Sequence, residues 1–278
     1  MQRGFLLREL TTDTPALIAA VLLVALVVTA VIAPLIVPYD PLSVDLDSLK
    51  QPPSRTHLLG TDSKGRDLLA RIIAGGRISL SIGITASFFS LCIGTILGMI
   101  AGYFGGRVDT VMTQVFDVVL AFPSLLLAIG ISAVIPPGLS SAMLAIVLVG
   151  WAGFARLVRG LTLSLKEQTY VEASRSLGAS SSRILFRHIL PNALPLLIVA
   201  ASLRVGGFIL LEAALSFLGL GVQPPTPTWG SMISLNRAYI YSSPWMVIFP
   251  GLAISATVMA FNIVGDFLRD KLDPRFQG

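Results

Sequence analysis

Long uninterrupted runs of apolar residues are the feature that most constrains how this chain can fold. Windows of about 20 residues with few charges, the length needed to cross roughly 30 Å of hydrocarbon, define six runs. They are Ala16–Val37, Ile78–Tyr103, Val111–Ile135, Ser141–Val158, Ala193–Leu218 and Trp245–Phe267. Because each run is continuous rather than alternating, it predicts a helix and not a barrel strand. The sequence therefore predicts an all-α integral membrane protein with six transmembrane helices.

Charge distribution predicts how this protein is oriented in the membrane. The first run has no small-residue cleavage site, so it is expected to be a retained helix. Six spans place both termini, residues 1–15 and 268–278, on one face. Of the 20 Lys and Arg residues, twelve fall on that face, seven on the other, and Arg204 lies inside a span. The positive-inside rule then predicts a multi-pass protein of the cytoplasmic (inner) membrane with both termini cytoplasmic. The net charge of +5 fits basic loops and requires no nucleic-acid partner.

The segment from residue 38 to residue 77 is expected on the extracytoplasmic face. From Asp62 onward, apolar residues recur at helical spacing opposite basic ones, which predicts an amphipathic helix that lies on the membrane surface and leads into the second span. The apolar positions are Leu68, Leu69, Ile72 and Ile73, and the basic positions are Lys64, Arg66 and Arg71. The stretch GTDSKGRD at Gly60–Asp67 has P-loop glycine spacing but offers Arg66 where Lys is needed, so no nucleotide site is expected there.

Residue types that carry catalysis or bind metals are few and scattered. Cys92 lies inside the second predicted span, and His57 and His188 fall in different loops. No predicted span presents a Ser/His pair, an HExxH helix or paired aspartates at helical spacing. The sequence therefore predicts no catalytic residue, no metal site and no cofactor held by this chain, and an intramembrane enzyme is the least favoured function.

Helix-packing signals occur inside two of the spans. In the second run Gly94, Gly98 and Gly102 recur every four residues, a ridge of small residues that allows close helix approach within the subunit or across a dimer. Pro123 in the third run marks a candidate kink.

A polar stretch separates the fourth and fifth predicted spans, within a cytoplasmic loop of about residues 159–192. A helix of about two turns is predicted from Tyr170, with Gly178 at the left-handed position that ends it. A second amphipathic helix follows, capped by one of Ser180–Ser182 and ending at Pro191. Because two helical turns are not stable alone in water, the segment is expected to dock on a partner or on the protein's own helices.

This stretch resembles the cytoplasmic coupling loop of permease subunits in binding-protein-dependent ABC importers. The motif of that family is Glu-Ala-Ala, three residues, Gly, nine residues and Ile-x-Leu-Pro. Here Glu172-Ala173-Ser174, Gly178 and Leu190-Pro191 stand at the matching positions, while Ser174 replaces an Ala and His188 replaces the Ile. The resemblance implies the ABC importer permease fold with a cytoplasmic coupling helix. It also implies that an ATPase is contacted by Tyr170, Val171, Glu172, Ala173, Ser174, Leu177, Gly178, Leu190 and Pro191.

Further stretches narrow the resemblance to the second permease subunit of dipeptide and oligopeptide importers. They are HLLGTDSKGRDLLARIIAGGRISL, AGYFGGRVD, LSFLGLGVQPPTPTWG, PGLAI and FNIVGDFLRDKLDPR. The resemblance implies a permease core over residues 78–267 that pairs with a homologous permease. It also implies two cytoplasmic ABC ATPase subunits that bind ATP and magnesium, an extracytoplasmic solute-binding protein, a peptide substrate and alternating access.

Ionisable residues inside spans usually face an internal cavity or a partner. Asp117, Arg204 and Glu212 qualify and are expected to line a translocation cavity. Asp117 also fits a helix-contact group, and the other two also fit a subunit interface. Arg204 and Glu212 are eight residues apart, about 12 Å along a helix, which is too far for direct pairing. In a cavity, Arg204 would meet a peptide carboxylate and Glu212 an ammonium group.

Two other functions remain open. A nickel importer permease resembles this chain closely, but imidazole and thiolate ligands do not line a path through its spans. A secondary transporter or channel would work without ATPase partners. The coupling motif argues against that class, and no convincing inverted repeat is detected.

Overall fold

The structure of the protein is a computed structural model that describes residues 9–37 and 39–272. Five of its helices are long and apolar enough to cross a membrane. They are α2 (Thr14–Ile36), α3 (Leu68–Phe104), α6 (Leu139–Leu165), α9 (Leu190–Phe217) and α11 (Trp245–Leu272). In the described ranges no β-strand forms, apart from a single bridge between Thr61 and Asp67. The predicted all-α membrane fold is confirmed.

The third predicted span is broken instead of forming one helix. It consists of α4 (Gly106–Ala121) and α5 (Ser124–Val134), which are bent by 90° relative to each other. The break falls at Pro123, which has no N–H to donate and forces Phe122 into an extended conformation, with φ −86° and ψ 139°. Counting this bent pair as one span gives the six expected crossings, and the predicted kink at Pro123 is a complete break.

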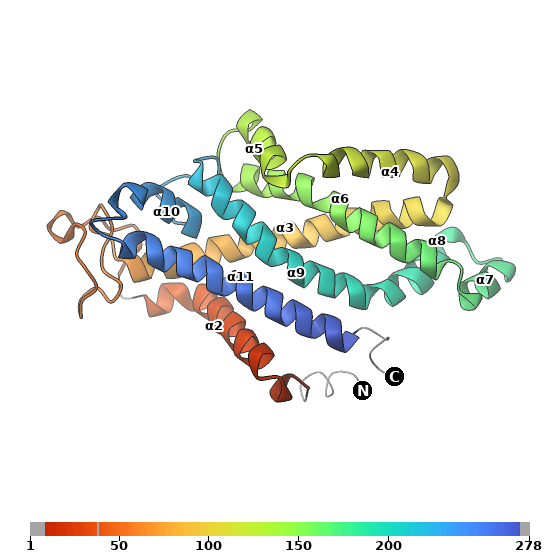
Figure 1. Cartoon of the computed structure of the whole chain (residues 1–278), viewed down its shortest axis with the longest axis horizontal. Helices are drawn as coiled ribbons and strands as arrows, with labels where there is room; N and C mark the ends of the chain where they lie inside the picture. The colour runs from red at the N-terminus through yellow and green to blue at the C-terminus, as the bar shows by residue number, and fades with distance from the viewer. Residues whose placement is uncertain (1–8, 38, 273–278) are drawn as a thin grey trace.

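Helices α3 and α6 lie side by side along much of the molecule (Figure 1). The glycine ridge of α3 makes this contact: an added β-carbon at Gly98 would lie 2.5 Å from the Ala155 carbonyl oxygen. Gly94 and Gly102 face the α6 backbone in the same way. The ridge therefore serves packing within the subunit, which decides between the two alternatives that the sequence left open.

A folded loop occupies the place where the surface helix was predicted to begin. Its centre is Asp62, which accepts a hydrogen bond from Arg66 Nε at 2.8 Å and lies 3.4 Å from Arg71 Nε. Arg71 is only 2% exposed and also donates to the Pro41 carbonyl at 2.8 Å. Arg66 and Arg71 of the predicted polar face are thus buried, because the Asp62 carboxylate neutralises them, while Lys64 is exposed.

Helix α3 begins only at Leu68, where the Asp67 side chain accepts a hydrogen bond from the Ala70 amide at 2.7 Å. Leu68 is fully buried, so this turn does not lie on a membrane surface. The prediction of an amphipathic surface helix from Asp62 is therefore wrong, although the helix does lead directly into the second span. Upstream, the segment contains one short 3-10 turn, η1 (Leu46–Ser48).

A buried short helix, α10 (Trp229–Asn236), follows α9 and was not predicted. Thr228 caps it, with its hydroxyl accepting from the Ser231 amide at 3.2 Å. Trp229 is 1% exposed and donates its indole N–H to the Ile72 carbonyl at 2.9 Å. The short turn η3 (Arg237–Tyr239) then leads towards α11. Helix α10 and the 39–67 segment lie at one end of the molecule, opposite α7 (Thr169–Ser176) (Figure 1).

Replacing Gly98 by alanine tests the α3–α6 contact. The added β-carbon meets backbone rather than a flexible side chain, so we expect a destabilisation of about 2 kcal/mol. The measurement is the melting temperature of the purified chain in detergent. The matched control is Gly160→Ala in α6, where nothing lies within 4 Å and alanine favours the helix by up to about 1 kcal/mol. Equal melting temperatures for the two variants would contradict the close contact.

Candidate functional site

Helix α7 is a short helix that is anchored on one side only. Val171 is fully buried in an apolar cluster, and the other buried members of this cluster come from α3, α6, α9 and residues 184–189 just before α9. Three of those members are Met99, Val158 and Leu197. The base of α7 therefore belongs to the same buried cluster as residues of the three long helices at the centre of the subunit.

The end of α7 is built as the sequence predicts. The Gly178 amide donates to the Arg175 carbonyl at 3.0 Å, and the Ala179 amide donates to the Ser174 carbonyl at 3.0 Å. This pair of hydrogen bonds is the Schellman arrangement, which needs a left-handed residue after the helix. Gly178 supplies it with φ +80°, and no other atom lies within 4 Å of the place of its missing β-carbon. The glycine is required by the backbone and not by crowding.

The helix after this turn does not stop at Pro191 as predicted. Its first part, α8 (Ser181–Ile184), is capped by Ser180 and passes through the π-helical turn η2 (Leu185–Ile189) into α9. Pro191 sits in the first turn of α9. The wider π turn shifts the hydrogen-bond register just before a residue that has no N–H, so the proline is accommodated without ending the helix.

The two departures from the family motif lie next to each other. The Ser174 hydroxyl donates to the Tyr170 carbonyl at 3.0 Å and lies 3.4 Å from His188 Nε2. The His188 ring also lies 6.3 Å from the Tyr170 ring, centroid to centroid. Ser174 and His188 thus make a polar contact between α7 and the π turn. The family motif has two apolar residues, Ala and Ile, at these positions.

The outward side of this segment is accessible. Leu177 is 88% exposed, and Glu172, Ala173 and Pro191 are also exposed, while Leu190 is half-buried. A short helix with a buried base, a fixed end and an exposed apolar tip can act as a docking element. Nothing in the described part of the chain covers that tip.

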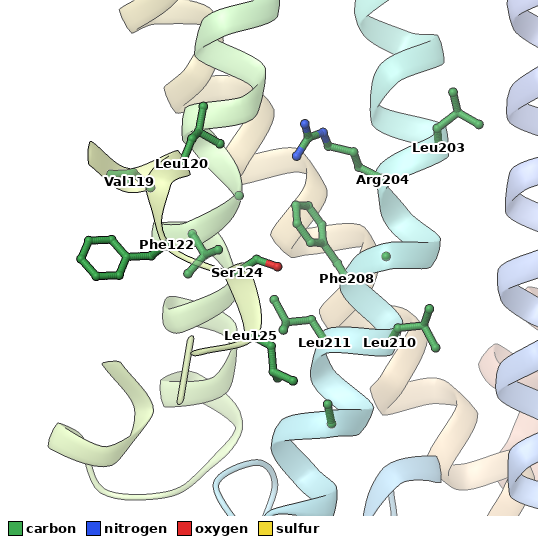
Figure 2. A pocket seen from close by; sticks show the side chains of 14 residues that line it. Val119, Leu120, Phe122, Ser124, Leu125, Leu203, Arg204, Phe208, Leu210 and Leu211 are labelled. Carbon is green, nitrogen blue, oxygen red and sulfur yellow. The ribbon is translucent and has the colours of Figure 1, made fainter. Parts of the chain in front are cut away.

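A pocket of about 480 Å³ lies between the α4–α5 break, α6 and α9 (Figure 2). Arg204, near the midpoint of α9, turns its guanidinium towards this pocket, and Phe122, Ser124 and Phe208 also line it. The guanidinium carbon lies 5.0 Å from the centre of the Phe154 ring. Arg204 is therefore placed as the sequence predicts for a cavity residue, and substrate contact stays a prediction.

Glu212 does not line this pocket, so the interpretation that it shares a cavity with Arg204 is corrected. Its carboxylate is fully buried and accepts hydrogen bonds from Ser79 of α3 at 2.9 Å and from Ser216 at 2.7 Å. The Trp229 amide of α10 also reaches the Ser79 hydroxyl, at 3.4 Å. Two hydroxyl donors hold the carboxylate inside the subunit, where it connects α9 to α3 and, through Ser79, to α10.

Asp117 is a helix-contact group in this structure. It forms an ion pair with Arg156 of α6, and it lies outside the pocket. A second pair nearby joins Asp109 to Arg159, with Oδ2 and Nη2 2.7 Å apart. These two pairs join α4 to α6. In the described ranges, no group of three His, Cys, Asp or Glu side chains is arranged to hold a metal ion.

Two residues beside the pocket, Gly153 and Ser124, were not predicted from the sequence. Gly153 faces Arg204 so closely that an added β-carbon would overlap the guanidinium. Ser124 begins α5 and turns its hydroxyl towards α9 (Figure 2). Pro123 was a signal for the start of α5, but no local pattern marks Gly153 as the neighbour of a residue 51 positions away.

The long helices, the broken third span and the short helix that projects between α6 and α9 define the class of protein: the membrane permease of an ABC importer. Their arrangement matches a chain of the MetNI methionine ABC transporter in inward-facing conformations, with a TM-score of 0.60 and 18% identity. The match covers 74% of this chain and 98% of that one. At this identity the comparison shows the fold alone.

The chain belongs to the family of binding-protein-dependent transport system inner membrane components, which it matches over residues 94–278. Residues 6–53 match the N-terminal transmembrane domain of oligopeptide transport permease C. The dipeptide transport system permease protein DppC of Alkalihalophilus pseudofirmus is 43% identical, over 97% of this chain and 89% of that protein. The glutathione transport system permease protein GsiD of Pectobacterium atrosepticum is 45% identical, over 94% of this chain and 87% of that protein. This chain is a dipeptide/oligopeptide-type permease, a class of non-enzymatic subunit.

Removing the Glu212 carboxylate tests its assignment as a buried anchor. Glu212→Ala leaves two buried hydroxyls without their acceptor and a cavity in α9, so we expect a loss of about 3 kcal/mol. Glu212→Gln keeps an acceptor oxygen and the volume, and its loss should be clearly smaller. Thermal unfolding of the purified chain gives the comparison, with the exposed Glu167→Ala as control. A Glu212→Ala variant as stable as Glu167→Ala would refute the assignment.

Proposed function

We propose that this chain is a transmembrane subunit of an ATP-driven importer that moves di- and oligopeptides across the cytoplasmic membrane. In this proposal it pairs with a homologous permease, receives peptide from an extracytoplasmic solute-binding protein and is driven by two cytoplasmic ABC ATPase subunits. ATP and magnesium are bound by those ATPases and not by this chain. The segment from Tyr170 to Pro191 is the contact to one of them.

The observation that carries the proposal is the one-sided anchoring of α7. Val171 at its base belongs to one buried apolar cluster with residues of α8, η2, α3, α6 and α9, while Leu177 at its tip is exposed. A force applied to the tip by a moving ATPase would therefore reach all three long helices through one apolar cluster. Such a rigid-body route is what alternating access driven from outside the membrane requires.

Sidedness in this proposal follows from charge. Arg175, Arg183 and Arg187 are all exposed on the α7 and α8–η2 segment, and an excess of basic residues favours the cytoplasmic face. Helix α2 runs away from the α7 end of the molecule and α11 runs towards it (Figure 1). Both termini then belong to the cytoplasmic side, and the 39–67 segment with α10 faces the solute-binding protein.

Peptide substrates are supported by the relatives and by the pocket. The two named relatives transport dipeptides and glutathione, and glutathione is itself a peptide. The pocket is wide enough for a short chain, and its lining is mostly apolar. Peptides with varied side chains require a lining without specific contacts. Nickel transport would instead need imidazole, thiolate or clustered carboxylate ligands. We therefore favour a peptide over nickel.

Gly178 variants in the reconstituted importer test the coupling role. Valine strains the φ of +80° without meeting any neighbour, whereas asparagine tolerates that conformation. We expect Gly178→Val to insert normally but to lower ATP-dependent uptake of a labelled dipeptide about tenfold or more. Gly178→Asn should retain most of the uptake.

The same reconstitution tests the function as a whole. Uptake by the parent complex must require ATP, an ATPase partner and a solute-binding protein. Peptide uptake by this chain alone in proteoliposomes would contradict the importer proposal. Unchanged uptake in Gly178→Val would remove the coupling role from this segment.

A further inference from the structure

The pocket beside α9 is lined mostly by apolar residues, but the charge that it contains is positive. Of its 14 lining residues, Arg204 and Ser124 are the two with polar side chains, and neither is acidic. Arg204 enters from α9, and Ser124 enters from the start of α5 (Figure 2). The polar groups that face this space are therefore a cation, a hydroxyl and the amino end of a helix.

Arg204 carries a charge that its own subunit does not balance. Among the described residues, no carboxylate lies within 4 Å of its guanidinium, whereas Arg66, Arg71, Arg156 and Arg159 all have an acidic partner. Its contact is the face of the Phe154 ring. An arginine near the middle of a membrane span is costly, and such residues face a partner, a ligand or water. The unpaired guanidinium thus favours an anion that this subunit does not supply.

The start of α5 adds to this positive charge. Pro123 stands at its N-cap position, and no side chain caps the helix. The first bond along the helix runs from the Leu127 amide to the Pro123 carbonyl at 3.0 Å, so the amides before Leu127 have no helical partner. The uncapped amino end of a helix carries a partial positive charge and favours anions. In membrane transporters, broken helices present such ends to anionic substrate groups.

We propose that Arg204 and the amino end of α5 form an anion subsite that receives the terminal carboxylate of the transported peptide. This inference rests on the proposed function and names what the pocket recognises. Because Glu212 is buried elsewhere, the pocket offers no matching group for the ammonium end. The subsite therefore binds the carboxylate end, and the rest of the peptide contacts the apolar lining of the pocket. One cation and one helix end in an open pocket hold an anion weakly, which suits a site that must release it.

Gly153 is the positioning residue of this subsite. It leaves a notch on α6 into which the Arg204 guanidinium fits, over the neighbouring Phe154 ring. A methyl group at Gly153 would occupy that notch. Because the displaced atoms are the far end of a flexible side chain, Gly153→Ala moves the charge without much loss of stability. Gly160 on the same helix faces open space and provides the matched control.

Charged thiol reagents measure the potential of the pocket directly. In the assembled complex with Cys92→Ala, a cysteine is placed at Gly207, which lines the pocket and has open space around it. Labelling rates are compared for an anionic and a cationic methanethiosulfonate of similar size. We expect Arg204→Gln to lower the anionic-to-cationic rate ratio on the order of tenfold. Gly153→Ala should lower it partly, and Gly160→Ala should not. A ratio that Arg204→Gln leaves unchanged overturns the proposal.

Peptide protection then tests the ligand. Alanyl-alanine at millimolar concentration should slow labelling of the Gly207→Cys complex, whereas alanyl-alaninamide, which has no carboxylate, should not. Equal protection by both, or by neither, overturns the assignment of the carboxylate. In uptake assays Arg204→Gln should lower dipeptide transport about tenfold and Arg204→Lys less, with the affinity of the binding protein unchanged.

Two other sources of an anion give different results. If a carboxylate of the partner permease pairs with Arg204, Arg204→Gln lowers the yield of the assembled complex. If a lipid phosphate does so, the rate ratio changes between phosphatidylglycerol and phosphatidylcholine nanodiscs. Either outcome overturns the subsite. A parent complex that takes up no peptide with ATP refutes the proposed function instead, whatever the labelling ratio shows.

Discussion

The close packing of α3 on α6 is the contact on which the rest of the structure depends. Gly94, Gly98 and Gly102 bring the two backbones together, because a side chain at any of these positions would overlap α6. In a bilayer the hydrophobic effect does not drive helices together, so small residues and van der Waals packing must do so. Helix α3 carries the Asp67 cap at one end and Met99 of the α7 cluster nearer the other. Helix α6 carries Gly153 and the ion pairs to α4.

The break at Pro123 is the second constraint. Backbone that leaves the helix inside a membrane needs either protein or water around it, since lipid cannot satisfy its polar groups. The break lies beside the pocket, where Ser124 and Phe122 are part of the lining. The pocket thus lies beside both the break and the unpaired Arg204. Two buried hydrogen bonds keep α9 and α10 in fixed positions on α3. They join Glu212 to Ser79 and Trp229 to Ile72.

The sequence predicts features that depend on local information. Apolar runs locate the spans because each window must match the bilayer by itself, and Gly178 is predicted because a helix end needs a left-handed residue. The surface helix is mispredicted because the burial of Arg71 depends on Asp62 and on the Pro41 carbonyl, contacts that helical periodicity does not contain. Glu212 is misassigned to a cavity because its donor Ser79 is 133 positions away. Helix α10 is missed because its eight residues show neither the length of a span nor a clear amphipathic pattern.

If the segment around α7 is the contact to an ATPase, a photo-crosslinking amino acid at Leu177 will capture that ATPase. Leu177 is 88% exposed at the tip of the segment, and Tyr241, 99% exposed in the connection between η3 and α11, is the matched control. We expect the Leu177 probe to crosslink to an ABC ATPase subunit in native membranes and the Tyr241 probe not to do so. A Leu177 probe that captures no ATPase, or a Tyr241 probe that does, would contradict it.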